Sequence, residues 1–275
     1  MRLATFFIPF AALLSGATGY FLRQNELWNI FDAKTGLPER GATETYALIA
    51  VSAVFLLLVL SFCIWVAVKR VSPKGFENAF GTDPLTYPFT FAVIAFVWLG
   101  ATVKYFIDFL PLEPLPLMEL FFSILSALAA ISVALFSIEM YQDPRRKMTF
   151  AMSIVPTIFM CFWLGIMYRE NASNPILLDY VYYCLAIITS ALAFYFTSGF
   201  VYNKPSPGKA LFFYFSAIYF CFVTLADGHV FAIKLIFSAI LAMNVIYSAK
   251  LIGHLRRKEP KEPKEPKEPK KTQEG

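Results

Sequence analysis

Long apolar segments recur along this chain at a length that matches a lipid bilayer. They cover residues 3–22, 46–68, 87–110, 117–141, 148–168, 175–200, 210–226 and 229–251. A helix of about 20 residues spans about 30 Å, the thickness of the hydrocarbon core. In lipid, backbone polar groups must be satisfied within the segment, so such segments form helices. The sequence therefore predicts an all-α, polytopic transmembrane helix bundle of about eight spans.

The charged residues fit a membrane protein better than a nucleic-acid-binding protein. They make up 16% of the chain, and the formal net charge is +5. Soluble domains carry about 25% charged residues. The basic residues stand in short clusters beside the spans, which is typical of membrane orientation and not of a phosphate-binding surface. We expect a lipid bilayer as the partner and no nucleic acid.

Lys and Arg are unevenly distributed between the loops. They follow the second, fourth, sixth and eighth spans, whereas the loops after the third and seventh spans contain neither, and the loop after the fifth has only Arg169. Short cytoplasmic loops are enriched in Lys and Arg. This asymmetry predicts a multi-pass protein of the cell (cytoplasmic) membrane with both termini in the cytoplasm.

The first span and the loop after it, residues 23–45, need separate treatment. This loop carries Arg23, Lys34 and Arg40 among four acidic residues, against the general pattern, and the later loops outweigh it. The first span also resembles a signal peptide. Because its apolar stretch is longer than a usual signal core, we predict an uncleaved helix. Cleavage would leave seven spans and an outside N-terminus.

Two regions of different composition divide the chain. Residues 1–255 are predicted to form the bundle, with a small outer loop at 23–45, and residues 256–275 contain a Lys-Glu-Pro repeat. Proline at every third position prevents a regular helix, and the repeat has no apolar residues to bury. We expect a disordered cytoplasmic tail. The alternative is a docking segment for a soluble partner.

Two short stretches near the N-terminus resemble a known family. They are residues 16–23 (GATGYFLR) and 31–37 (FDAKTGL), within about the first fifth of the chain. They are similar to a family of polytopic membrane proteins of anaerobic Gram-positive bacteria that has no assigned activity. The resemblance implies a location in the cytoplasmic membrane and adds no mechanism.

The residues that most cofactors and metals require are scarce. The chain has two histidines, His229 and His254, and no C-x-x-C, H-E-x-x-H or G-x-G-x-x-G motif. A membrane b-type haem needs two axial ligands, usually histidines at matched depth, and His254 lies in a cytoplasmic flank. We therefore expect no catalytic motif, no cofactor and no metal.

Ionisable residues within spans are costly in lipid and indicate function. Lys104 and Asp108 lie four residues apart on one helix face. Lys234 lies in the last span, and both lysines are predicted about 9 Å below the outer boundary at 1.5 Å per residue. One hypothesis is an outward-facing pocket with the two lysines at its floor. The alternative is that the lysines extend to the outer headgroups.

Asp179, Asp227 and His229 lie at or above the level of these lysines. If Lys104 and Lys234 face the interior, each needs a carboxylate, because an unpaired buried ammonium would lose its proton. The expected partners are Asp108 for Lys104, and Asp227 or Asp179 for Lys234. Such a pocket would bind an anionic small molecule or a lipid headgroup.

Three classes of function agree with these observations. The first is a non-enzymatic binder, accessory subunit or transporter-like protein. The second is an integral-membrane enzyme that acts on lipid or quinol through the outer carboxylates and His229. The third is an anchor that recruits a soluble partner through its tail. The middle of the bundle is almost wholly apolar, which argues against alternating-access transport.

Two further patterns predict how the helices pack. Small residues at Ala11, Ser15 and Gly19 indicate a face of the first helix that a neighbour can approach closely. Aromatic belts collect at membrane boundaries, and we expect one here that includes Tyr168, Tyr180, Tyr182 and Tyr183.

Overall fold

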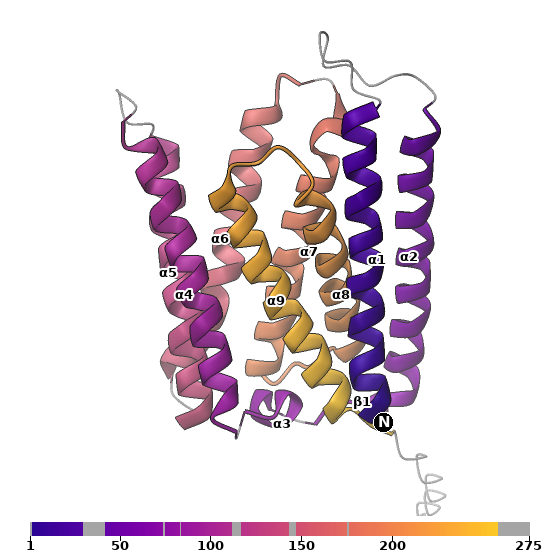
Figure 1. Ribbon diagram of the computed structural model, residues 1–275. Coiled ribbons are helices and arrows are strands. Elements are labelled where there is room, and N and C mark those ends of the chain that lie inside the picture. Colours follow the sequence, from indigo (N-terminus) through magenta and orange to yellow (C-terminus); the bar gives the residue numbers. More distant parts are fainter. Residues whose placement is uncertain are drawn as a thin grey trace, which may run out of the picture.

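The computed structural model describes residues 2–29, 42–73, 75–82, 84–111, 117–142, 147–174 and 176–257. Long helices run side by side through this part of the chain, and a short helix and a two-residue strand pair lie at one end (Figure 1). The elements are α1 (Arg2–Asn29), α2 (Thr43–Lys69), β1 (Arg70–Val71), α3 (Phe76–Phe80), α4 (Thr86–Phe109), α5 (Leu117–Gln142), α6 (Lys147–Asn171), α7 (Leu177–Val201), α8 (Pro207–Thr224), α9 (Phe231–His254) and β2 (Arg256–Arg257).

Among the described residues, seven helices are long and apolar enough to cross a membrane, namely α2 and α4 to α9. This confirms the all-α polytopic bundle and makes the chain a multi-pass membrane protein in a lipid bilayer. The additional long helix is α1, which has 28 residues. That α1 also crosses the membrane, for a total of eight spans, stays a prediction.

Two predicted boundaries differ from the structure. The loop placed at 23–45 is shorter, because α1 continues to Asn29 and α2 begins at Thr43. The tail placed at 256–275 begins later, because Arg256 and Arg257 form β2 and pair antiparallel with Val71 and Arg70. The Lys-Glu-Pro repeat and residues 30–41 lie outside the described residues.

Helix α8 lies at the centre of one half of the bundle. It contacts α1, α2, α7 and α9. Of its apolar 18-residue stretch, 72% is buried inside the bundle, which is the largest share among the seven helices. Its sequence is rich in aromatic residues, and Tyr214, Tyr219 and Phe220 are all buried. Rings bring large contact areas and edge-to-face packing, so this helix forms an aromatic core for its neighbours.

Helix α1 reaches α8 through a stripe of small residues that continues into charged ones. The buried stripe is Ala12, Gly16, Gly19, Arg23 and Glu26, at the three- and four-residue spacing of one helix face. Of the predicted small-residue face, Gly19 is buried but Ala11 is exposed. A Cβ at Gly19 would lie 2.7 Å from Cγ2 of Val223, so the helices approach at backbone distance there.

The short helix α3 covers one end of the bundle. Glycines bound it, and both have positive φ, 83° at Gly75 and 58° at Gly81, which residues with a side chain rarely adopt. The rings of Phe76 and Phe80 stack at 4.4 Å and are buried. Lys250 of α9 donates to the carbonyl of Gly81 at 3.0 Å. We call this the α3 end, and β1 and β2 lie at it (Figure 1).

The close approach of α1 to α8 predicts a strong effect of one methyl group. Gly19→Ala should destabilise the bundle by about 1–3 kcal/mol, because the neighbouring Val223 and Tyr219 are fully buried and must move. The matched control is Gly100→Ala on α4, where a Cβ has nothing within 4 Å. Thermal unfolding of both variants in detergent tests this. Equal melting temperatures would contradict the packing.

Candidate ligand-binding site

A buried arginine organises the end of the bundle opposite α3. Arg23 of α1 donates from Nε to Oδ1 of Asp227 at 2.8 Å and from Nη1 to Oε2 of Glu26 at 2.8 Å. Its Nη2 donates to the main-chain carbonyl of Asp179 on α7 at 3.2 Å. Arg23 and Glu26 are fully buried. A buried charge needs paired and hydrogen-bonded partners, and this guanidinium has them on three sides.

The same network extends to α2 and to an aromatic ring. Thr45 of α2 donates to Oε1 of Glu26 at 2.8 Å. The ring of Tyr182 lies under the guanidinium, with 5.3 Å from Cζ of Arg23 to the ring centroid. The network therefore joins α1, α2, α7 and the 225–230 connection between α8 and α9. It fixes these segments relative to one another at one end of the molecule.

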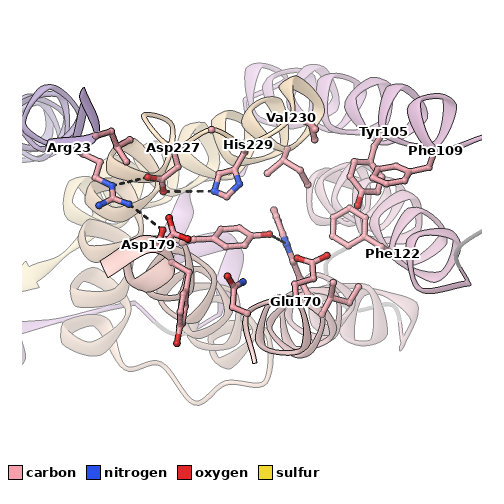
Figure 2. Close-up of a pocket in the computed structure, with 17 residues that line it drawn as sticks. Arg23, Tyr105, Phe109, Phe122, Glu170, Asp179, Asp227, His229 and Val230 are labelled. Carbon is pink, nitrogen blue, oxygen red and sulfur yellow. Dashed lines mark hydrogen bonds and ion pairs between the residues drawn. The ribbon is translucent and has the colours of Figure 1, made fainter. Parts of the chain in front are cut away.

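A cavity of about 420 Å³ lies beside this network. We call it the end cavity. Its lining comes from α1, α4, α5, α6, α7, α9 and the 225–230 connection: Arg23, Leu27, Tyr105, Phe109, Phe122, Trp163, Ile166, Glu170, Asn171, Asp179, Tyr180, Tyr183, Asp227, Gly228, His229, Val230 and Ile233. Ligand pockets commonly have about 300–1,000 Å³. Figure 2 shows the labelled side chains around it.

The end cavity has an exposed rim and a buried floor. Glu170, Gly228 and Val230 are exposed, whereas Trp163 and Phe122 are each 1% exposed. From Asn171 to Trp163 along α6, the lining extends about 12 Å into the bundle at 1.5 Å per residue. The cavity thus opens at the surface and ends on aromatic rings.

Two polar atoms on the cavity wall have no hydrogen-bond partner among the described residues. They are Oδ2 of Asp227 and Nε2 of His229, and both are buried. They lie 3.8 Å apart, which is too long for a hydrogen bond (Figure 2). Buried polar atoms are normally paired, so these two atoms point to a group that binds between or beside them.

The ionisation of this pair follows from its burial. Burial raises the pKa of the Asp227 carboxyl to about 6, although the Arg23 guanidinium acts in the opposite direction. Burial lowers the pKa of His229 to about 4, and the charge of Lys234 acts in the same direction. At pH 7 the imidazole is therefore neutral and the carboxyl is mostly ionised. Asp227 and His229 do not form an ion pair with each other at this pH.

Aromatic rings form a continuous wall around the end cavity. Phe122 and Trp163 meet edge to face at 5.3 Å, and Tyr183 lies 6.1 Å from Trp163. The ring of Tyr183 also faces His229 at 4.3 Å. The Trp163 indole donates to the Tyr183 hydroxyl at 2.6 Å, and the Tyr105 hydroxyl donates to Glu119. These hydrogen bonds hold the rings in fixed orientations.

Half of the predicted site residues come together in this cavity. Asp179, Asp227 and His229 line it, whereas Lys104, Asp108 and Lys234 do not. The prediction that Lys104 faces the interior is wrong, because its side chain is 52% exposed. It pairs with Asp108, as expected, one helical turn away. Asp227 pairs with Arg23 and not with Lys234.

The sequence reasoning missed the residue that holds the site together. The sequence predicts Arg23 and Glu26 in a loop, because polar residues follow the apolar segment there. Their spacing of three residues on the continuing small-residue stripe was the available signal. Tyr182 and Tyr183 were expected in a boundary belt but are buried, at 4% and 8% exposure, whereas Tyr168 is 74% exposed.

The buried network predicts a large loss of stability when its cation is removed. Arg23→Met leaves Glu26 and Asp227 without their buried partner, which should cost about 3–5 kcal/mol. The control is Arg169→Met, which removes an exposed arginine from α6 at the same end. Unfolding in detergent compares the two variants. If they lose equal stability, the network is not what fixes this end.

Comparisons with protein-family models, with curated proteins and with solved structures found no match to this chain. The resemblance of residues 16–23 and 31–37 to a bacterial membrane-protein family stays a prediction. The function of the chain therefore has to be argued from the geometry of the end cavity.

Proposed function

We propose that this chain is a cell-membrane protein of eight spans, with both termini in the cytoplasm, that binds a small solute or lipid headgroup in the end cavity. In this orientation the cavity opens to the outside. The proposal combines the Lys and Arg asymmetry of the loops with the position of the cavity at the end opposite α3.

One observation carries the binding function. Asp227 and His229 line the cavity, and each has a buried polar atom, Oδ2 and Nε2, without a hydrogen-bond partner in the described part of the chain. Leaving a buried polar group unpaired costs about 1–3 kcal/mol, so a ligand that pairs with both atoms would recover this free energy. The network around Arg23 holds one of the two residues in place before any ligand arrives.

The depth of the cavity favours a binder over a transporter. The lining ends on Trp163 and Phe122, and α3 covers the other end of the bundle with Phe76 and Phe80. A transporter places its substrate near the bilayer midplane, between helices that open to both sides in turn. The end cavity instead lies within the final turns of the helices at one end.

A membrane enzyme that acts on lipid or quinol is the second candidate. The neighbouring carboxyl and imidazole of Asp227 and His229, beside Glu170 in an aromatic cavity, favour it. The lowered pKa of His229 argues against it, because an imidazole with a pKa of about 4 is a weak base at neutral pH. The third candidate, an anchor acting through its tail, rests on residues outside the described ones.

The orientation can be tested with single cysteines in a variant whose native cysteines are alanine. Gly228→Cys and Lys204→Cys place exposed thiols at opposite ends of the bundle. In intact cells, a membrane-impermeant maleimide should label the thiol at 228 and should label that at 204 only after permeabilisation. The opposite pattern would mean that the cavity faces the cytoplasm.

Binding can be tested by blocking the cavity mouth. Val230→Trp adds a large ring to an exposed lining residue, and Phe231→Trp changes its exposed neighbour, which does not line the cavity. Calorimetry on protein in maltoside detergent uses choline, glycerol 3-phosphate and glucose as probes of three charge classes. At least one probe should bind the native chain. Its affinity should be about tenfold lower for Val230→Trp and unchanged for Phe231→Trp. Absence of binding by all three would contradict the proposal.

A further inference from the structure

We infer that the end cavity binds a small organic cation, with an ammonium group among the aromatic rings and a donor group on Asp227 and His229. This inference rests on the proposed binding function and specifies its ligand. It departs from the anionic ligand expected from Lys104 and Lys234, since neither lysine lines the cavity.

The charges on the cavity wall favour a cation. Three carboxylates line the cavity, on Glu170, Asp179 and Asp227, against the one guanidinium of Arg23. That guanidinium is buried and hydrogen-bonded to Asp227, Glu26 and the Asp179 carbonyl, so its charge is already balanced inside the wall. An anion entering the cavity would meet three carboxylates on the lining, where the only Lys or Arg among the described lining residues is Arg23, which is already paired.

The rings supply the second part of a cation site. Tyr105, Phe109, Phe122, Trp163 and Tyr183 line the end cavity, together with Tyr180. The face of an aromatic ring carries negative charge density and attracts ammonium groups, most strongly when water is excluded. Trp163 and Phe122 are buried at the floor, where this attraction is least screened. A cage of rings beside carboxylates is the arrangement that recognises alkylated ammonium ions.

The two atoms without partners specify a hydrogen-bond donor on the ligand. The ionised Asp227 carboxyl only accepts hydrogen bonds, and its Oδ2 is buried on the wall. The neutral His229 ring can accept at Nε2 when its proton is on Nδ1. At 3.8 Å, one N–H or O–H group between these atoms could donate to either. A hydroxyl or amine elsewhere on the ligand, such as the hydroxyl of choline, would supply that donor.

An ammonium ligand has two natural sources, a free solute and the headgroup of a lipid. Choline represents the free ion, and glycerophosphocholine carries the same ammonium with the phosphate and glycerol of a lipid headgroup. The exposed rim at Val230 and Gly228 leaves room for either to extend outward. Tighter binding of glycerophosphocholine would assign the lipid source, and tighter binding of choline the free solute.

The test compares choline with 3,3-dimethylbutan-1-ol, which has the same shape and hydroxyl but no charge. Calorimetry on the full chain in maltoside detergent should give choline an affinity on the order of tenfold higher than the alcohol. Glycerol 3-phosphate should bind more weakly than choline. If glycerol 3-phosphate binds in the cavity and choline does not, the inference of a cationic ligand is wrong and the proposed binding function stands. If no probe binds, both fail.

Two variants link the affinity to the cavity, with a control outside it. Glu170→Gln removes one rim carboxylate, which is exposed, so folding should be preserved. Trp163→Leu removes the floor ring. Each variant should lower the affinity for choline several-fold and leave the affinity for the neutral alcohol nearly unchanged. Lys104→Met, outside the cavity, should change neither affinity. If Glu170→Gln folds and binds choline like the native chain, or if Lys104→Met weakens choline as much as Glu170→Gln does, the assignment is overturned.

Discussion

A guanidinium taken out of water costs several kcal/mol unless it is paired and hydrogen-bonded. Arg23 meets this condition by drawing a carboxylate from its own helix, another from the 225–230 connection and a carbonyl from α7. Because losing any one partner would cost free energy of folding, α1, α7 and the 225–230 connection are held in fixed relative positions. The end of the bundle that holds the cavity therefore depends on one ionic network.

The packing that brings Arg23 to this point depends on small residues of α1. Gly16 and Gly19 lie on the same face of α1, and they let its backbone approach α8 at Phe222 and Val223. In lipid, apolar burial gives little drive for helix association, so close backbone approach and polar contacts carry it. On α1, the first half of the interface uses close backbone approach at Gly16 and Gly19, and the second half uses the polar contacts of Arg23 and Glu26. A change at Gly19 would thus be felt at the arginine one turn further on.

Much of the fold could be predicted because lipid imposes a length and a hydropathy on each span. The seven helices from α2 to α9 that can cross a membrane were all expected within a few residues. The rotation of a helix about its axis is less accessible, because it depends on the neighbours. Lys104 is exposed while the next residue, Tyr105, lines the cavity, since successive residues point about 100° apart. The position of Lys104 along its helix could be predicted from the sequence, and the direction of its side chain could not.

The candidate site shows the same limit. That Asp227 and His229 lie near a helix end could be predicted from the sequence, but the pairing of Asp227 with Arg23 joins residues 204 positions apart. Counting Arg23 as a loop charge also enlarged the conflict between the 23–45 loop and the other loops, to which Lys34 and Arg40 still contribute. The structure places Arg23 within α1, paired with two carboxylates, and not in that loop. The Lys and Arg asymmetry is stronger once it is left out.

The end cavity has its exposed rim on one side and aromatic rings at its floor, with α3 covering the far end of the bundle. A molecule that enters such a blind recess leaves by the same mouth. Its binding then requires no concentration gradient across the membrane. The fraction of protein with this molecule bound depends only on its concentration on that side. On the proposed binding function, this geometry suits equilibrium binding from one side of the membrane and not transport across it.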